Sequence, residues 1–224
     1  MFILVGCEES QEVTKAFRAL GHEAYSCDLQ ECSGSHPEWH LKMDVFDAIR
    51  GGYLKTQSGN TIYIDKWDMG IFFPDCTYLT VTANKWYKDQ PKRKSGVLVG
   101  EERRQARKKA IAFAINLYNC PIPKVAMENP VGVLSSEFRK PDQIIQPYMF
   151  GHPEPKKTCL WLKNLPKLIP TNIVEQEPYH VTKSGKNMPK WYAYADKSKG
   201  QAERAKIRSK TFPGIAKSMA SQWI

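Results

Sequence analysis

Residues 67–80, "WDMGIFFPDCTYLT", predict a buried strand followed directly by a turn. The run "MGIFF" has the composition of a buried strand, and Pro74 ends it because proline has no N–H for a sheet ladder. Cys76 then stands where the chain must turn. A thiol in this place is either a nucleophile presented at a strand end or a small core residue. Asp75 beside it should make the thiolate harder to form.

The same strand signal recurs on both sides of this stretch, separated by helical patterns. Further strands are predicted at 2–5 ("FILV"), 22–27 ("HEAYSC"), 124–128 ("KVAME") and 157–162 ("KTCLWL"). Helices are predicted at 11–20, 44–49, 101–118 and from near Pro213 onward, with a hairpin at 53–64. Short strands that alternate with helices are typical of βα units on a parallel sheet. We therefore expect an α/β, Rossmann-like fold with a mainly parallel sheet, helices on both faces and a small irregular C-terminal insertion.

Composition narrows the class of protein. The chain has 224 residues, of which 42% are hydrophobic and 25% charged, as in an ordinary globular domain spanning 1–224. No apolar run approaches the ~20 residues of a membrane span, and the N-terminus has no basic leader. Six cysteines in such a chain indicate reduced thiols and a cytoplasmic location. The net charge of +10 favours a polyanionic partner, although a lysine-rich surface also serves solubility.

Polar or reactive residues follow four of the predicted strands. They are Gly6-Cys7-Glu8, Asp28, Pro74-Asp75-Cys76 and Glu128-Asn129-Pro130. Any one of these acids, taken alone, is as compatible with a helix cap as with a site. In a doubly wound sheet, however, sites lie beyond the carboxyl ends of the strands, so all four groups should face one crevice.

The acids near the first two strands indicate the kind of cofactor. Asp28 lies roughly 20 residues beyond the first turn, where an acid can bind ribose hydroxyls. The sequence "GCEES" is not a glycine-rich phosphate loop, and Glu8 and Glu9 would repel a pyrophosphate at the next helix. A cofactor with a ribose, no phosphates and a positive centre fits better. S-adenosylmethionine has these properties and NAD does not.

Cys76 and Glu128 together suggest chemistry on a pyrimidine. A thiolate can add to carbon 6 of the ring, while a carboxylic acid holds the exocyclic amine and nitrogen 3. That addition makes carbon 5 nucleophilic toward a sulfonium methyl group. The basic, aromatic loop that starts at Lys85 can close over a nucleic-acid backbone, with Trp86 and Tyr87 against bases.

These features resemble the DNA cytosine methyltransferases that act at carbon 5, in a compact form similar to proteins of bacterial viruses and prophages. The segments that carry the resemblance are "ILVGCEES", "SCDL", "HLKMDV", "FFPDCTYLT", "VAMENPVG", "KPDQIIQPYMFGHPEPKKTCLWLKNLP" and "RSKTFPGIAKSMASQW". The resemblance implies a methyltransferase fold, S-adenosylmethionine as cofactor and DNA as partner. It also implies a mobile catalytic loop at 77–100 and a reduced target-recognition insertion at 171–210. We expect a monomer in the cytoplasm, or in the host cytoplasm if the protein is viral.

The resemblance also implies a set of site residues. The catalytic residues are Cys76 as nucleophile, Glu128, Asn129, and Lys157 or Thr158 in support of the glutamate. The cofactor-binding residues are Val5, Gly6, Cys7, Glu8, Asp28, Leu29, Asp44, Val45, Pro74, Pro213 and Gly214. The DNA-binding residues are Thr77, Lys85, Trp86, Lys88, Lys92, Arg93, Lys94 and Arg103.

One departure keeps two other functions open. The family has a proline directly before its nucleophile, whereas this chain has Asp75 there, with Pro74 one place earlier. The protein is alternatively a related enzyme that uses another donor or a free nucleotide, or a silent DNA-binding relative. Metal binding is not expected, because the Cys27, Cys32, His36 and His40 spacing departs from that of zinc sites.

Overall fold

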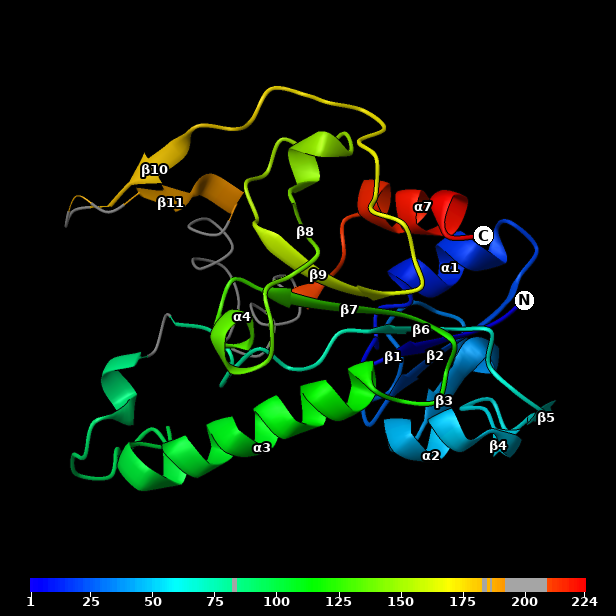
Figure 1. Cartoon of the computed structure of the whole chain (residues 1–224), viewed down its shortest axis with the longest axis horizontal. Helices are drawn as coiled ribbons and strands as arrows, with labels where there is room; N and C mark the ends of the chain where they lie inside the picture. The colour runs from blue at the N-terminus through cyan, green and yellow to red at the C-terminus, as the bar shows by residue number, and fades with distance from the viewer. Residues whose placement is uncertain (82–83, 183–184, 186, 192–208) are drawn as a thin grey trace.

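A mainly parallel seven-stranded sheet forms the centre of the molecule in the computed structural model, which describes residues 1–81, 84–182, 185, 187–191 and 209–224 (Figure 1). Its order is β3-β2-β1-β6-β7-β9-β8. The strands are β1 Phe2–Gly6, β2 Glu23–Asp28, β3 His40–Lys42, β6 Met69–Phe72, β7 Lys124–Pro130, β8 Gln143–Ile145 and β9 Thr158–Lys163. β1, β2, β3, β6 and β7 are parallel, and β9 runs antiparallel to both β7 and β8. The predicted α/β class is confirmed.

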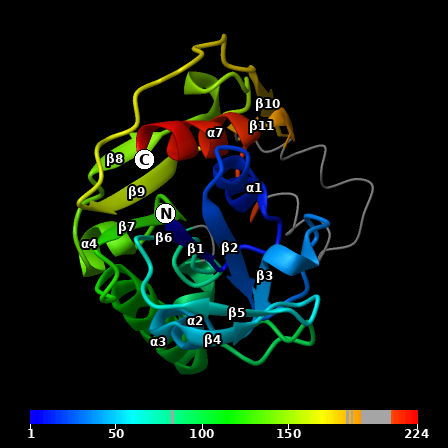
Figure 2. The same ribbon diagram turned by 90° about the vertical axis from the view of Figure 1, so that its right-hand side faces the viewer.

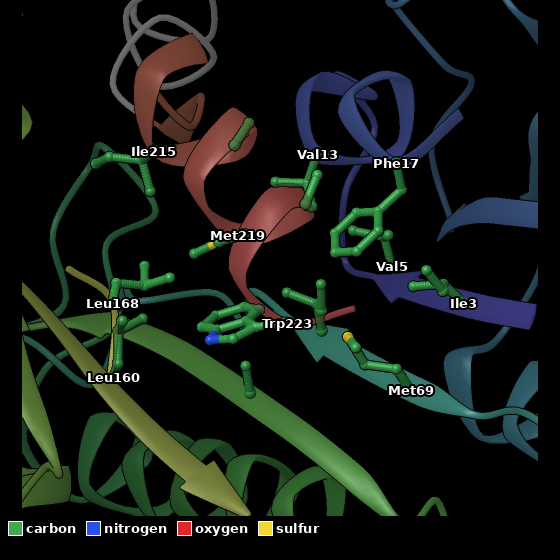
Figure 3. Packing of buried hydrophobic residues seen from close by; sticks show 14 of the residues in the cluster. Ile3, Val5, Val13, Phe17, Met69, Leu160, Leu168, Ile215, Met219 and Trp223 are labelled. Atoms are coloured by element: carbon green, nitrogen blue, oxygen red, sulfur yellow. The ribbon is translucent and has the colours of Figure 1, made fainter. Parts of the chain in front are cut away.

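Helices cover both faces of this sheet, as predicted. α1 (Glu12–Arg18) and α7 (Pro213–Gln222) lie on one face, and α2 (Val45–Arg50) and α3 (Gly100–Tyr118) lie on the other (Figure 1). The alternation of side chains along β1 explains this layering, since Ile3 and Val5 pack with α1 and α7 whereas Leu4 packs with α2 and α3. Figure 3 shows Phe17 from α1 and Trp223, the residue directly after α7, in the first of these cores.

The predicted hairpin is also present. β4 (Gly52–Lys55) and β5 (Thr61–Ile64) pair antiparallel and lie beside α2 (Figure 2), where Leu54 and Ile64 join the core. The short elements η1 Pro37–Trp39, η2 Asn84–Tyr87, α4 Leu134–Glu137, η3 Pro147–Met149, β10 Tyr179–Val181 and β11 Asn187–Pro189 complete the described chain. Of the expected insertion at 171–210, residues 183–184, 186 and 192–208 lie outside the described residues, as do 82–83 of the expected loop at 77–100.

In α3, Ala114 and Leu117 are fully buried, whereas Ile111 and Ile115 remain partly exposed. Within the described part of the chain, no helix has the length and apolar character needed to span a membrane.

The order of the strands defines where a site should lie. The chain moves from β1 outward to β2 and β3, and then returns to β6 on the opposite side of β1. The reversal between β1 and β6 is a topological switch point, and ligands of open α/β sheets bind beyond the carboxyl ends of the strands at such points.

Candidate active site

The turn that carries Cys76 lies at this switch point. Gly6 and Phe72 are register partners at the ends of β1 and β6, and Phe73 N donates to Gly6 O at 3.0 Å. From the neighbouring strand β7, Asn129 Nδ2 donates to Pro74 O at 2.7 Å. Asn129 therefore holds the turn, as predicted, and brings the end of β7 against the end of β6.

Hydrogen bonds fix the backbone around Cys76. Asp75 Oδ1 accepts from Thr77 N at 3.0 Å and from Thr77 Oγ1 at 2.8 Å, so Asp75 caps the turn through its side chain. Cys76 O accepts from Leu79 N at 3.0 Å and from Thr80 N at 3.1 Å. Because the Leu79 side chain is fully buried, the turn is also anchored in the core.

The surroundings of Cys76 favour the neutral thiol. Burial raises the pKa of the partly buried Cys76 to about 11, with further increases from the carboxylates of Asp75 and Glu128. The positive charge of Lys156 acts in the opposite direction. A nucleophilic role therefore requires added positive charge or a loss of negative charge near the sulfur.

Replacement of Asp75 by asparagine should make Cys76 more reactive. The amide keeps an oxygen for Thr77 but removes the negative charge, so the pKa of Cys76 should fall below about 11. We expect its alkylation by iodoacetamide at pH 8 to become roughly three- to tenfold faster, as measured by mass spectrometry of the Cys76 peptide. Asp65→Asn, at an exposed position, is the control. An unchanged rate would show that the Asp75 charge does not act on the thiol.

Glu128 lies near the end of β7 and is, after Asp75, the second carboxylate that acts on the Cys76 thiol. Burial raises its pKa, while Lys156 and a hydrogen bond from Thr158 partly oppose the shift. The raised pKa favours the protonated acid, which can donate a hydrogen bond to a ring nitrogen. Glu128 thus combines with Cys76 to give a weakly acidic donor beside a thiol.

The cation that supports Glu128 is Lys156, not Lys157. Lys157 or Thr158 was predicted to support Glu128. Thr158 is buried and hydrogen-bonds Glu128, whereas Lys157 is exposed. Extended backbone directs alternate side chains to opposite faces, so Lys156 and Thr158 lie on the side of Glu128 and Lys157 does not. Lys156 was missed because its position relative to the strand start was not defined by the pattern "KKTCLWL".

A small cavity adjoins this acid. Its lining consists of Glu128, Lys156, Thr158, Thr211, Phe212, Ile215 and Met219. Ile215 and Met219 of the lining come from α7 and Phe212 directly precedes this helix, which places the predicted Pro213 and Gly214 beside the cavity.

The start of α7 contacts residues 150–152, which lie about 60 positions earlier in the sequence. His152 Nε2 accepts from Gly214 N at 3.0 Å, and a Cβ on Gly214 would lie 1.8 Å from Phe150 O. Only glycine therefore allows this approach. Neither His152 nor Phe212 was singled out from the sequence as a site residue, because their positions here depend on contacts about 60 residues apart.

Acidic groups surround the end of β1. Burial raises the pKa of Cys7, and Asp28, Asp44 and Asp75 raise it further, so these carboxylates lie around one strand end. A side chain at Gly6 would contact Val45 Cγ2 at 2.6 Å, which explains the glycine at this position. Asp28 accepts from Gln30 N at 2.9 Å, and Leu29 is 71% exposed.

Several predicted cofactor contacts need correction. Glu8 is buried and caps α1 from inside, because its carboxylate accepts from Val13 N at 2.7 Å and Thr14 Oγ1 at 2.8 Å. The Val5 and Val45 side chains belong to the hydrophobic cores. Asp44 caps α2 by accepting from Phe46 N at 2.7 Å, although it remains exposed. The side chains of Glu8, Val5 and Val45 are thus removed from the candidate cofactor surface.

Glu8 should make stability depend on pH. Burial raises its pKa to about 7, above its ordinary value, and the hydrogen bonds only partly oppose this. A raised acid pKa gives a contribution that is full below about pH 4.5 and is lost as the pH rises through 7. The unfolding free energy of wild type, compared with Glu8→Gln, should therefore fall by about 3 kcal/mol from pH 4.5 to 7. Urea denaturation checks this, and a constant difference between the two proteins would contradict it.

Most of the predicted DNA-binding residues are exposed, whereas Arg103 is buried. Lys85, Lys88, Lys92, Arg93 and Lys94 are exposed, and Thr77 lies in the Cys76 turn. The Trp86 ring lies 3.9 Å from Arg93 Cζ and 4.6 Å from Lys85 Nζ. Arg103 is only 4% exposed and donates to Leu98 O at 3.3 Å, so it is removed from the predicted phosphate contacts.

The two imidazoles near β2 have partners within the fold. His40 bonds Ser26 at 2.8 Å and Gln30 O at 2.9 Å, while His36 pairs with Glu38. Among the described residues, which include all four candidates, no group of three or more His, Cys, Asp or Glu side chains is arranged to hold a metal.

In comparisons with known proteins, no family model matches the chain and no curated protein matches it significantly.

Proposed function

We propose that the protein transfers a methyl group from S-adenosylmethionine to carbon 5 of cytosine in DNA. The observation that carries this proposal is the meeting of Cys76 and Glu128 at the switch point of the sheet. Asn129 joins the two strand ends by its 2.7 Å bond to Pro74 O, and each acid group acts electrostatically on the thiol. A thiol and a protonated acid in one place are the two groups that addition to a pyrimidine requires.

The choice of cofactor is supported by the start of α1. Glu8 already occupies the N–H groups of Val13 and Thr14, at 2.7 and 3.3 Å, which in dinucleotide-binding folds would face a pyrophosphate. The carboxylates of Asp28 and Asp44 near Cys7 suit a cofactor with a ribose and a positive centre. β9 also lies between β7 and β8 and runs antiparallel to both, unlike the strand order of dinucleotide-binding sheets.

The side chains divide the reaction between them. S-Adenosylmethionine, when bound, would supply an electrophilic methyl group and would leave as a neutral thioether. The Cys76 thiol loses its proton to solvent, and the thiolate bonds to carbon 6 of the cytosine. Glu128 donates its proton toward nitrogen 3 while charge develops there, which leaves carbon 5 nucleophilic. After transfer, the carbon 5 proton leaves to solvent, Glu128 recovers its proton and the carbon–sulfur bond breaks.

DNA as the substrate is supported by the charge of the chain and by the exposed lysines and arginine beside Trp86. The target cytosine must leave the base stack to reach a partly buried thiol. We propose that the protein acts as a monomer, with 77–100 as its mobile catalytic loop and 171–210 as its recognition insertion.

The decisive experiment is mass spectrometry of nucleosides from DNA exposed to the protein and S-adenosylmethionine. The expected product is 5-methylcytosine. Parallel incubations of duplex DNA, single-stranded DNA and dCMP with labelled cofactor separate the related functions, because each substrate gives a distinct labelled product. Binding to DNA without a labelled methyl group would instead identify a silent relative, and the methyltransferase proposal would fail.

A further inference from the structure

Three arginines near the start of α3 contact the segment that follows Cys76. Arg107 Nε donates to Tyr78 O at 2.8 Å, and Arg107 Nη2 donates to Thr80 O at 3.0 Å and to Asn84 Oδ1 at 3.1 Å. Its Cζ lies 3.5 Å from the centre of the Tyr87 ring. The Arg107 guanidinium thus contacts both residues 78–80 and residues 84–87. In agreement with these contacts, η2 lies beside α3 (Figure 1).

Arg103 and Arg104 extend the same arrangement. Arg103 Nη2 lies 3.5 Å from Thr77 O and the guanidinium lies over Tyr78 and Tyr87. Arg104 Nη1 donates to Tyr87 O at 2.8 Å, and Nη2 donates to Asp89 at 2.9 Å. Positions 103 and 107 are one helical turn apart, so their side chains lie on one face of α3.

These bonds give the backbone carbonyls of the segment partners on α3. The carbonyls of Thr77, Tyr78 and Thr80 immediately follow the nucleophile candidate, and all three accept from arginine. Tyr78 O accepts a second bond from Tyr87 Oη at 3.0 Å. The planar fork of arginine can bind two carbonyls and stack on a ring at once, which lysine cannot do.

We propose that Arg107, together with Arg103 and Arg104, is a positioning residue that holds the Cys76 turn in register, and that these arginines are not phosphate contacts. This inference rests on the proposed function only for its effect on methyl transfer. The contacts of these arginines with residues 77–80 and 84–89 are present in the free protein and can be tested without any reaction.

Arg107→Lys separates the two roles, because it keeps the charge and loses the fork. A misplaced reacting group can cost about 10²-fold, so we expect kcat for methyl transfer to fall by about that factor with KM for DNA unchanged. Tryptic cleavage after Lys85 or Lys88 in the free protein should become about tenfold faster. Arg107→Ala should leave the salt slope of DNA binding unchanged, whereas loss of a phosphate contact would lower it by about 1.

Two further variants serve as controls, one for misfolding and one for the loss of a positive charge from α3. Tyr87→Phe removes only the hydroxyl bond to Tyr78 O and should accelerate cleavage about threefold. Lys109→Ala removes an exposed cation from the same helix and should behave as wild type in cleavage and kcat. Wild-type cleavage rates in both Arg107→Lys and Tyr87→Phe would overturn the inference, as would a reduced salt slope in Arg107→Ala. If the wild type shows no methyl transfer, the proteolysis still decides whether the arginines hold the loop.

Discussion

Replacement of Cys76 by alanine is expected to abolish methyl transfer to DNA. The thiol is the only proposed source of the covalent bond to carbon 6, and without that bond carbon 5 is not nucleophilic enough to accept a methyl group. The rate in single-turnover assays with labelled cofactor should fall by at least about 10⁴-fold. The fold should survive, because Cys76 is only partly buried and its turn is held by backbone bonds and by Leu79.

The matched control is Cys32→Ala, which removes another partly buried thiol at a position outside the proposed site. Its backbone N–H bond to Gln57 Oε1, at 3.0 Å, does not involve the sulfur. This variant should keep the wild-type rate. A Cys76→Ala protein that retains a tenth or more of wild-type activity would show that the reaction does not pass through this thiol.

Replacement of Glu128 by glutamine is expected to give the second largest loss. The amide preserves the size of the side chain and an acceptor for Thr158, but it cannot transfer a proton to nitrogen 3 of the ring. Removal of a general acid typically costs about 10²- to 10⁴-fold. We expect the loss in kcat, measured at saturating DNA and cofactor, with little change in the dissociation constant for DNA.

Glu137→Gln is the control for the loss of one acid, because Glu137 is exposed on the short helix α4. The protonation state of Glu128 gives a further check. Because burial raises its pKa, its acidic form should persist to higher pH than that of an ordinary glutamate. A Glu128→Gln protein with a rate within threefold of wild type would remove Glu128 from the mechanism.

Elements that depend on local sequence patterns were predicted correctly, whereas elements that depend on distant partners were not. β1, β6, β7 and α3 were predictable, because several consecutive residues repeat an apolar pattern that local geometry imposes. β3 and β8 are three residues long and give no such pattern, so neither was identified as a strand in the sequence. Their place in the sheet depends on partners from distant parts of the chain.

The roles of charged residues were less predictable. A glutamate after β1 has the same sequence signal whether it binds a cofactor or caps α1, and only the bonds to Val13 and Thr14 show that Glu8 caps. Arg103 was likewise predicted to contact DNA. Arg103 proves to be buried, and Arg107 binds carbonyls more than 25 positions away in the sequence.

By itself, the sequence determined the α/β class, the position of Cys76 after a buried strand and the expectation that several strand ends meet. These follow from local patterns of burial and from the geometry of parallel sheets. The tertiary structure alone decided that Lys156 faces Glu128, that Asn129 bonds Pro74, and that arginines hold the turn after Cys76. Side-chain hydrogen bonds and charge interactions act over a few ångströms, so they depend on which distant segments the fold brings together.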